Sequence, residues 1–585
     1  MKKICGEEGA LLLDIHEKYN QWVSLCAQDP QLSRELQKIQ EDPRAIEDRF
    51  YRDLAFGTAG MRGILGAGPN RINRFTIRRA AAGLADYLRL DAGTPQGPVA
   101  IAYDSRHQSD LFARETALML ASRGIKALLF DALRPVPVLS FAVRHLKAAA
   151  GVVITASHNP PEYNGFKAYG PDGAQLSPEA AQGVTGRMDA LSYEALSPMA
   201  EDEALRKGLL TYIGETEVDA AYTRMVLSLQ VRPDVVRAFG DQLRIVFTPL
   251  HGAGNLPVRR VLAEAGFSQV IVVPEQELPD PDFSTVKAPN PEDPGAFALA
   301  IPLAQSEGAT VIIGTDPDCD RLGVCVKDGE GVFRTLSGNQ IGCLILHHIL
   351  SQRQKAGTLP KNGACIKSIV STELARVICE GFGASIFNVL TGFKFIGEKI
   401  QAFEETGSHT FLFAFEESFG YLSSTQVRDK DAVNAALLVA EAACVCLSEG
   451  ITLYERLQQI YREYGYFTES VVSNTYPGKE GAERMAEIMA QLRQNPPTAL
   501  GGLPVTALRD YLSGIRSRGD QKEPLDTSPS DVLYFELAGG HWLCARPSGT
   551  EPKIKFYAGA SHKDSMEKAQ MTADQMMADI RALAE

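Results

Sequence analysis

The sequence predicts an α/β protein of several domains, in which three successive α/β blocks are followed by a smaller C-terminal α+β domain. Up to about residue 465, short apolar runs rich in β-branched residues alternate with longer segments of helical periodicity. Beyond Thr468 this alternation stops, and strand-like runs flank a helix and a Pro/Gly-rich link. A chain of 585 residues that is 45% hydrophobic has enough apolar material for about three to five domain cores.

The individual elements follow in chain order. Residues 1–50 predict helices separated by polar residues. The predicted strands are Val99–Tyr103, Gly151–Thr155, Leu243–Phe247, Val270–Val273, Thr310–Ile313, Cys365–Val370, Phe411–Ala414 and Val532–Leu537. The predicted helices include Asp110–Ser122, Pro257–Ala265, Asp431–Ser448 and Gly481–Gln494. Strand–helix alternation favours mainly parallel strands. We predict four domains, at 1–205, 206–330, 331–465 and 466–585.

The composition argues against several classes of protein. Lys and Arg number 59 against 72 Asp and Glu, and a net charge of −13 argues against a nucleic-acid-binding protein. The ten cysteines form no CxxC pair, so we expect neither a zinc site nor a disulfide framework, and a cytoplasmic location. Glu7 and Glu8 interrupt any signal peptide, and the longest apolar stretch, Ala432–Leu447, is shorter than the ~18 residues of a membrane span.

The first segment that carries chemistry is GVVITASHNPPEYNGFKAYG, residues 151–170. A buried strand runs into Ser157, and Pro160 and Pro161 prevent a helix from following it. Ser157 is therefore predicted on a loop at a strand end, where α/β ligand sites lie, with Lys167 on the same local unit. A serine hydroxyl is a weak nucleophile and needs a base or charge neutralisation nearby. A turn-forming serine without chemistry explains the local sequence equally well.

The second segment is ATVIIGTDPDCDRLG, residues 309–323, in which an apolar strand ends in Asp316, Asp318 and Asp320. In an extended backbone these alternate side chains share one face, and three converging carboxylates repel one another unless a cation is present. Oxygen ligands indicate Mg²⁺, with Mn²⁺ or Ca²⁺ as alternatives. An EF-hand is excluded because Arg321 and Lys327 replace its Gly and Glu; a solvated acidic turn is the other interpretation.

Two further segments supply groups suited to phosphates and sugars. In RPSGTEPKIKFY, residues 546–557, Arg546 precedes small residues whose backbone N–H groups can turn toward an anion. In FLFAFEESFGYL, residues 411–422, a hydrophobic strand delivers Glu416, Glu417 and Ser418, and carboxylates accept hydrogen bonds from sugar hydroxyls. Each segment by itself is equally compatible with an ordinary turn.

Four shorter segments place basic residues near glycines or turns: FGTAGMRG (56–63), YDSRHQS (103–109), TGFKFIGEK (391–399) and VRDKDAV (427–433). Considered individually, each of these basic residues is interpreted as a surface charge: Arg62, Arg106, Lys394, Arg428 and Lys430. TGFKFIGEKI lacks the Gly-Lys-Ser/Thr of a P-loop. In HGAGNLP, residues 251–257, Pro257 replaces the third glycine of a dinucleotide-binding loop.

The order of the motifs is more specific than any one of them. TASHNP, GTDPDCDR, EESFG and RPSGTEP follow one another between residues 155 and 552. This order resembles the α-D-phosphohexomutase superfamily, which includes phosphoglucomutases and phosphomannomutases. FGTAGMRG and the chain length are most similar to its bacterial α-phosphoglucomutase branch. The resemblance spans residues from about 50 to 560. It implies a four-domain, heart-shaped enzyme in which each domain contributes one loop to a single cleft.

The resemblance also implies a role for each matching residue. The implied metal ligands, for one Mg²⁺ ion, are Ser157 as phosphoserine together with Asp316, Asp318 and Asp320. The implied catalytic residues are Ser157, His158, Arg62 and Lys167, the last as general acid or base. The residues implied to bind substrate are Arg321, Thr391, Lys394, Glu416, Ser418, Arg428, Lys430, Arg546, Ser548, Gly549 and Thr550.

The implied activity is that of an isomerase, an intramolecular phosphotransferase that interconverts glucose 1-phosphate and glucose 6-phosphate through glucose 1,6-bisphosphate. Mannose and pentose phosphates stay open as substrates, and a non-catalytic sugar-phosphate-binding protein is the alternative of another class. The expected partners are small-molecule sugar phosphates, with neither nucleic acid nor membrane, and the chain is expected to be a monomer or a dimer. Two residues depart from the family pattern: Cys319 stands where Ala is usual, and Phe415 stands where Gly commonly precedes the sugar loop.

Overall fold

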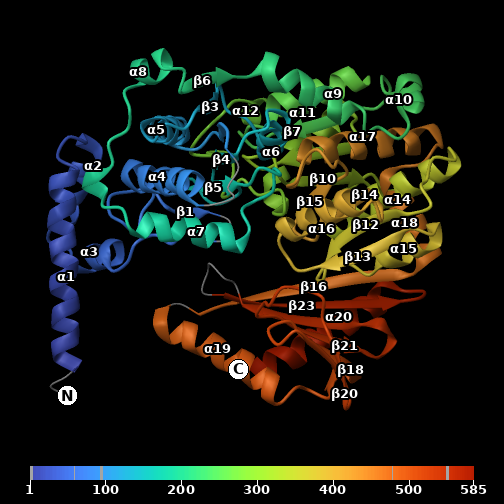
Figure 1. Cartoon of the computed structure of the whole chain (residues 1–585). Coiled ribbons are helices and arrows are strands. Elements are labelled where there is room, and N and C mark those ends of the chain that lie inside the picture. Colours follow the sequence, from blue (N-terminus) through green and yellow to red (C-terminus); the bar gives the residue numbers. More distant parts are fainter. Residues whose placement is uncertain (1–3, 58–59, 92–95, 477, 548–552, 585) are drawn as a thin grey trace. The chain divides into compact units, whose positions relative to one another are not determined.

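The computed structural model describes residues 4–57, 60–91, 96–476, 478–547 and 553–584. The chain divides into two compact units. Unit 1 comprises Met1–Cys325 and Gly420–Val445, and unit 2 comprises Val326–Phe419 and Cys446–Glu585. The helices and strands are numbered in chain order, and Figure 1 labels them where there is room.

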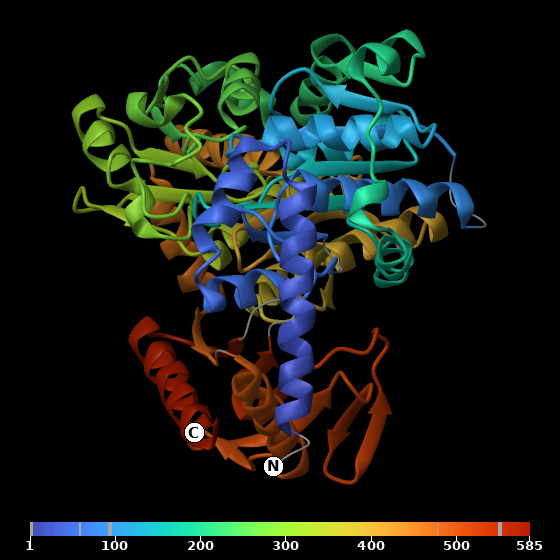
Figure 2. The ribbon, with the colours of Figure 1, turned by 90° about the vertical axis from the view of Figure 1, so that its left-hand side faces the viewer.

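Unit 1 begins with the helices α1 (Ile4–Leu25), α2 (Pro30–Ile39) and α3 (Pro43–Phe50). Asp29 and Asp42 each accept hydrogen bonds from backbone N–H groups at the start of the following helix, whose first turn contains a proline. Trp22 and Phe50, with ring centroids 6.2 Å apart, belong to the core that joins these helices. The N-terminal part of α1 extends beyond α3 in both ribbon views (Figures 1 and 2).

The first α/β domain has a six-stranded sheet in the order β1-β5-β4-β2-β3-β6. Its strands are β1 (Met61–Ile64), β2 (Val99–Tyr103), β3 (Ala127–Phe130), β4 (Ala150–Ile154), β5 (Tyr163–Tyr169) and β6 (Leu210–Ile213). Its helices are α4 (Arg74–Leu90), α5 (Ser109–Ser122), α6 (Val136–His145), α7 (Pro178–Asp189), the short η1 (Tyr193–Ala195) and α8 (Glu201–Arg206). β2, β3, β4 and β6 are parallel, in agreement with the prediction of mainly parallel strands, although β3 and β6 were not themselves predicted. β5 is antiparallel to β1 and β4, because the segment 155–162 is too short for a crossover helix.

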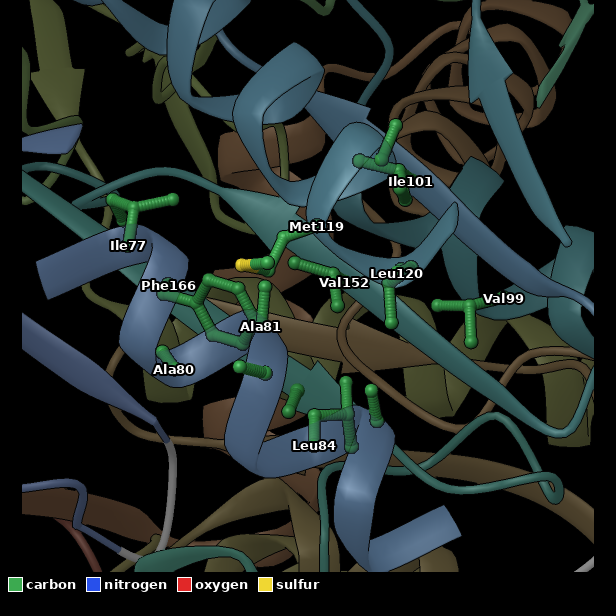
Figure 3. Packing of buried hydrophobic residues seen from close by; sticks show 14 of the residues in the cluster. Ile77, Ala80, Ala81, Leu84, Val99, Ile101, Met119, Leu120, Val152 and Phe166 are labelled. Atoms are coloured by element: carbon green, nitrogen blue, oxygen red, sulfur yellow. The ribbon is translucent and has the colours of Figure 1, made fainter. Parts of the chain in front are cut away.

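One apolar cluster fixes the strands that carry the first motif. Figure 3 shows side chains of α4 and α5, among them Ala81 and Met119, packed together with Val152 of β4 and Phe166 of β5. Val152 and Phe166 have no exposed surface. Burial at this density resists changes of even one methylene group. The two strands that flank the Ser157 loop are therefore held rigidly.

The second part of unit 1 contains sheet strands in the order β10-β9-β7-β8. Its elements are η2 (Glu215–Asp219), α9 (Ala220–Leu227), α10 (Pro233–Phe239), β7 (Ile245–Thr248), α11 (Asn255–Ala265), β8 (Val270–Val272), α12 (Pro274–Glu277), η3 (Pro294–Phe297), α13 (Ala300–Glu307), β9 (Val311–Thr315) and β10 (Leu322–Lys327). β7 is parallel to β8 and β9, as predicted. The chain later returns to unit 1 with β15 (Gly420–Leu422) and most of α17 (Ala432–Ser448).

Unit 2 begins with a third α/β segment. Its elements are β11 (Phe333–Thr335), α14 (Gly338–Lys355), β12 (Gly363–Ser368), α15 (Leu374–Phe382), β13 (Ser385–Val389), α16 (Phe393–Thr406), β14 (Thr410–Glu416) and α18 (Leu453–Tyr464). β12 lies between β13 and β14 and is parallel to both. Ser337 and Gln340 form a capping box at the start of α14. Phe415 of β14, one of the two departures from the family pattern, is buried, and an added Cβ on Gly342 of α14 would meet its ring.

The C-terminal domain is built on a larger antiparallel sheet in the order β16-β23-β22-β21-β18-β19-β20, with β17 beside β18. Its elements are β16 (Tyr466–Thr475), α19 (Gly478–Gln494), β17 (Ala499–Leu500), β18 (Leu503–Asp510), β19 (Ile515–Arg518), β20 (Gln521–Pro524), β21 (Leu533–Leu537), η4 (Ala538–Gly540), β22 (Trp542–Pro547), β23 (Lys553–His562) and α20 (Met566–Ala584). The predicted helix and the strand near residue 532 are present; β18, β19 and β20 were not predicted.

Among the described residues, no single helix has both the length and the apolar character needed to cross a membrane. The helices α17 and α18 reach that length and composition only as a pair, and they are bent by 86° relative to each other. The nine cysteines whose side chains are described are all buried, and none of them forms a disulfide.

Replacement of Gly342 by alanine is expected to destabilise unit 2. The added Cβ would stand 2.5 Å from the buried ring of Phe415. We expect the free energy of unfolding to fall by about 1–3 kcal/mol, which scanning calorimetry would register as a lower unfolding temperature. Gly186→Ala on α7 is the control, because open space surrounds Gly186 and alanine should stabilise the helix by about 0.5–1 kcal/mol. An unchanged unfolding temperature for Gly342→Ala would contradict the expectation.

Candidate active site

Ser157 lies on the loop that follows β4 and is almost completely buried, with 2% of its surface exposed. Its φ angle is +53°, a conformation that few non-glycine residues adopt and that the surroundings must enforce. Its backbone N–H donates to Thr155 Oγ1 at 2.8 Å, and its hydroxyl donates to Asp316 Oδ2 at 2.8 Å. The predicted nucleophile is therefore in contact with the predicted metal cluster.

Arg106 holds the Ser157 loop, and its interpretation as a surface charge was wrong. The guanidinium has no exposed surface. It donates to backbone carbonyl oxygens along the loop, at 2.6 Å for Ser157, 2.8 Å for Pro160, 3.1 Å for Tyr163, and also to Asn159. Carbonyl groups in a buried loop need such partners because no strand or helix supplies them. The guanidinium thus fixes the path of the loop.

The Asp104 carboxylate holds two residues that contact the Ser157 loop, Arg106 and Thr155. One carboxylate oxygen accepts from Ser109 Oγ at 2.8 Å and from the Arg106 N–H at 3.0 Å, and the other accepts from Thr155 Oγ1 at 2.6 Å. Sequence analysis missed this pair. The available signal was the Asp-x-Arg that directly follows β2, because β2 and β4 are parallel neighbours whose carboxyl ends lie together.

The three aspartates after β9 converge as predicted, but by a different path. Their carboxylate oxygens lie within 4.8 Å of one another, and all three side chains are buried. The backbone is not extended as we had assumed. The Cys319 N–H donates to the Asp316 carbonyl at 2.9 Å, and Cys319 has a φ of +51°, so the loop is a tight turn. This tight turn brings the three buried carboxylates together.

The charge of this cluster is only partly balanced by the protein. Burial and the neighbouring aspartates raise the pKa of Asp316 well above its usual range. Burial alone would also raise the pKa of Asp320, but Lys430 and Lys167 outweigh that effect and lower it. The Lys167 ammonium lies 2.7 Å from Asp318 Oδ2 and 3.6 Å from Asp320 Oδ2. Two lysines therefore serve as counterions within a cluster that has three carboxylates.

The cluster fits a divalent metal ion. Among the described residues, Oδ1 of Asp318 and Oδ1 of Asp320 are buried without a hydrogen-bond partner. Buried carboxylate oxygens are costly in that state, and a hard cation with oxygen ligands would satisfy them. The cation would compete with Lys167 for Asp318. The donor set contains oxygen atoms only, since the nearby Cys319 thiol faces Gly254 and Thr315.

The glycine-containing loop 251–254, which follows β7, packs against the turn that carries the three aspartates. The Ala253 N–H donates to the Pro317 carbonyl at 2.8 Å. A Cβ on Gly252 would lie 2.5 Å from Pro317 Cα, and one on Gly254 would lie 2.7 Å from Cys319 Sγ. The HGAG motif, which we had rejected as a dinucleotide-binding loop, thus allows two backbones to approach closely.

Further polar residues of unit 1 surround Ser157. Arg62 on β1 donates to Asn159 Oδ1 at 3.0 Å. His158 Nδ1 lies 3.3 Å from Ser157 Oγ, and burial together with the cations Arg321 and Arg62 lowers the pKa of His158 well below its usual value. This shift favours the neutral imidazole. The Arg321 N–H donates to Asp316 Oδ1 at 3.0 Å.

The segment 427–431 is buried, which corrects the interpretation of its basic residues as surface charges. Arg428 has no exposed surface, and its backbone N–H donates to Ser140 Oγ at 2.8 Å. The Lys430 ammonium lies 3.1 Å from Asp320 Oδ2 and 2.9 Å from Asp429 Oδ1. Lys430 thereby joins the acidic cluster directly.

The remaining predicted residues belong to unit 2. Glu416 ends β14, and its Oε1 accepts from the Gly392 N–H at 2.7 Å, which ties it to the segment of Thr391. Lys394 Nζ lies 4.9 Å from the ring centroid of Phe395, and burial lowers the pKa of Lys394. Ser418 is half-buried in the turn after β14. Arg546 lies on β22, whereas three predicted residues lie outside the described ones: Ser548, Gly549 and Thr550.

Comparison with known proteins gives the family. Residues 53–195, 220–329 and 337–464 match, in order, the alpha/beta/alpha domains I, II and III of phosphoglucomutase/phosphomannomutase. A phosphoglucomutase of Staphylococcus haemolyticus is 38% identical over 517 residues, 87% of this chain and 91% of that protein. A phosphoglucomutase of Staphylococcus aureus is 38% identical over 536 residues, 91% of this chain and 94% of that protein. The chain belongs to the phosphoglucomutase/phosphomannomutase family.

A solved structure agrees at the level of the fold. The exocytosis-sensitive phosphoprotein pp63/parafusin (phosphoglucomutase) from Paramecium superposes with a TM-score of 0.66 at 16% identity, covering 91% of this chain and 95% of that one. The predicted family resemblance is confirmed, and so are the three α/β domains with a separate sheet-rich C-terminal domain and the prediction of an enzyme.

Arg106→Ala should loosen the Ser157 loop without unfolding the domain. Four backbone carbonyls would lose the Arg106 guanidinium as a hydrogen-bond donor, so we expect faster hydrogen–deuterium exchange in peptides that span 156–163, measured by mass spectrometry. Arg123→Ala is the control, because Arg123 forms a half-exposed ion pair with Asp86 and contacts no loop carbonyl. Exchange at wild-type rates in Arg106→Ala would refute this account of the loop.

Asp316→Asn should have opposite effects on the metal-free and metal-bound protein. Ionised Asp316 opposes folding at pH 7, because its pKa is raised in the folded state, so the metal-free variant should unfold at a higher temperature. Mg²⁺ affinity should fall at least about tenfold, measured by calorimetric titration, because one ligand charge is lost. Asp202→Asn, a change of an exposed carboxylate on α8, should alter neither quantity. Unchanged Mg²⁺ affinity in Asp316→Asn would exclude Asp316 as a ligand.

Proposed function

We propose that this chain is a phosphoglucomutase, which interconverts α-D-glucose 1-phosphate and glucose 6-phosphate through a phosphorylated Ser157. One observation carries the proposal: the Ser157 hydroxyl lies 2.8 Å from Asp316 in a buried cluster of three carboxylates. A serine at a hard-cation site can store a phosphoryl group, because the charge of that group needs neutralisation. The 38% identity to two staphylococcal phosphoglucomutases supports glucose as the sugar.

We assign Mg²⁺ to the acidic cluster. Its proposed ligands are Asp316, Asp318, Asp320 and an oxygen of phosphorylated Ser157. The bound ion would neutralise charge on the phosphoryl group and so favour its transfer. A buried set of oxygen donors supports Mg²⁺ over metals that prefer sulfur or imidazole.

In the first transfer, the 6-hydroxyl oxygen of glucose 1-phosphate bonds to phosphorus while the bond between phosphorus and Ser157 Oγ breaks. The Lys167 ammonium donates a proton to the departing Ser157 oxygen, and the amine that results takes up the proton of the attacking hydroxyl, so glucose 1,6-bisphosphate, a free serine and the original ammonium result. In the second transfer the phosphoryl group at C1 returns to Ser157, and the sugar oxygen regains a proton. Lys167 suits this task because β5 is paired with β4 and places it opposite Val153, close to the Ser157 loop.

The other residues bind or orient the substrate in this proposal. Neutral His158, as the tautomer protonated at Nδ1, can donate a hydrogen bond to Ser157 Oγ and keep it oriented while the hydroxyl donates to Asp316. Glu416 and Ser418 are assigned to sugar hydroxyls. The phosphate that does not react is assigned to Arg546, Ser548, Gly549 and Thr550, where an arginine and small residues suit an anion. The further cationic and polar groups of the site are Arg62, Arg321, Thr391, Lys394, Arg428 and Lys430.

Ser157→Ala should remove turnover and leave the metal site intact. Without the acceptor oxygen no phosphoenzyme forms, so the rate of glucose 6-phosphate formation should fall by on the order of 10⁴-fold or more in a coupled assay. Mg²⁺ should still bind, because the three carboxylates remain, but with lower affinity than in phosphorylated wild-type protein, which supplies a fourth ligand. Ser122→Ala is the control, since that hydroxyl only donates to the Met119 carbonyl within α5.

Intact mass measurement supplies the second half of this test. One phosphoryl group on wild-type protein, mapped to Ser157 and absent from Ser157→Ala, is the expected result. Substituting mannose 1-phosphate or ribose 1-phosphate in the assay ranks the sugars. A protein that glucose 1,6-bisphosphate cannot phosphorylate and that shows no turnover would contradict the proposal and favour a sugar-phosphate-binding protein.

A further inference from the structure

A lysine with no exposed surface lies at the end of β12, outside the residues assigned above to the site. The Lys367 ammonium donates to Glu373 Oε1 at 2.9 Å, to the Ser371 carbonyl at 3.1 Å and to the Ser368 carbonyl at 3.4 Å. These contacts match its three N–H donors, which a buried ammonium requires. An apolar residue of similar volume would often serve stability as well. The specific contribution of the ammonium is therefore the path that it imposes on the segment 368–373.

That segment is bonded to the loop 416–418, which we call the sugar loop. Ser371 Oγ accepts from the Glu417 N–H at 3.1 Å, and Ser368 Oγ donates to Glu417 Oε2 at 2.9 Å. The two serine hydroxyls are themselves 2.8 Å apart. Glu417 is thus held at its backbone and at its carboxylate by two residues whose carbonyls bind Lys367.

The sugar loop is also confined from the other side. A Cβ on Gly338, at the start of α14, would lie 2.1 Å from the Glu417 carbonyl oxygen, so α14 touches the loop backbone there. Glu416 is bonded in turn to the Gly392 N–H at 2.7 Å. The sugar loop lies against the segment 368–373 and against the start of α14. While both stay in place, its side chains have little freedom to change direction.

We propose that Lys367 is a positioning residue for the sugar loop and acts through Ser371 on Glu417. In this arrangement Glu417, the middle residue of the Glu-Glu-Ser motif, is half-buried and hydrogen-bonded to Ser368 and Ser371, which holds its neighbours Glu416 and Ser418 in place for a hexose phosphate. The identity of the ligand as a hexose phosphate rests on the function proposed above. The position of the loop is independent of that function, because it follows from the contacts among Lys367, the two serines and Glu417.

Ser371 offers a variant pair that separates the hydroxyl from its surroundings. Ser371→Ala removes the acceptor for the Glu417 N–H, whereas Ser371→Thr keeps a hydroxyl at that position. We expect hydrogen–deuterium exchange in peptides that span 411–422 to accelerate about tenfold in Ser371→Ala and to stay near the wild-type rate in Ser371→Thr. Lys367→Met should accelerate exchange in the same peptides. Lys355→Met, a change of an exposed lysine on α14, should not.

Substrate binding gives a readout that loss of stability alone would not reproduce. We expect Ser371→Ala and Lys367→Met to raise KM for glucose 1-phosphate about tenfold. The Mg²⁺ affinity and the extent of Ser157 phosphorylation, measured by intact mass, should not change. Ser371→Thr should restore the wild-type KM. If the wild-type protein shows no turnover, the proposed function fails, and the Kd for glucose 1-phosphate from calorimetric titration replaces KM in this comparison.

Three results would overturn the inference. The first is wild-type exchange in peptides 411–422 of both Ser371→Ala and Lys367→Met. The second is accelerated exchange in those peptides with an unchanged KM or Kd, because the loop would then have no bearing on the sugar. The third is loss of protection throughout unit 2 in both variants, which would make the network a requirement of folding and not of loop placement.

Discussion

Three carboxylates that are buried beside one serine set the conditions for the rest of unit 1. In surroundings of low dielectric constant such a cluster repels itself, and the raised pKa of Asp316 expresses that cost. Lys167 and Lys430 lie within ion-pair distance of the cluster and offset part of its charge. The elements that deliver these groups must therefore keep their positions, because a displaced partner would leave a buried charge uncompensated.

Each unit contains a candidate loop that depends on a buried cation: Arg106 binds the Ser157 loop directly, and Lys367 acts on the sugar loop through Ser368 and Ser371. Arg106 in unit 1 and Lys367 in unit 2 are cations without exposed surface, and each lies at or just beyond the carboxyl end of a central parallel strand. Each donates to backbone carbonyls of a loop that has no strand or helix to satisfy them. A charged donor makes stronger hydrogen bonds than a neutral one, so a single side chain can define several residues of an irregular loop.

Sequence patterns predicted the parts of the molecule that are dictated locally. Buried parallel strands are continuous apolar runs, and β2 was predicted with its correct bounds. β18, β19 and β20 escaped prediction because they bury little, and all four residues of β20 are exposed. The spacing of the aspartates indicated a cluster, but the positive φ of Cys319 could not be foreseen from a rule that assumes extended backbone. The burial of Arg106 depends on a loop about fifty residues further along the chain, which its own neighbours do not reveal.

The antiparallel pairing of β4 and β5 places the proposed nucleophile and the proposed base on one hairpin. Ser157 follows the first strand, and Lys167 lies on the second, opposite Val153. Their separation is therefore set by the register of the two strands. The short connection between the strands and the hydrogen bonds that pair them fix this register. Rearrangement of other domains during a reaction cycle could change which ligand reaches this pair, but it could not change the distance between its two members. The hairpin therefore fixes the distance between the two proposed groups, whereas the carboxylates proposed to bind the metal come from the loop after β9.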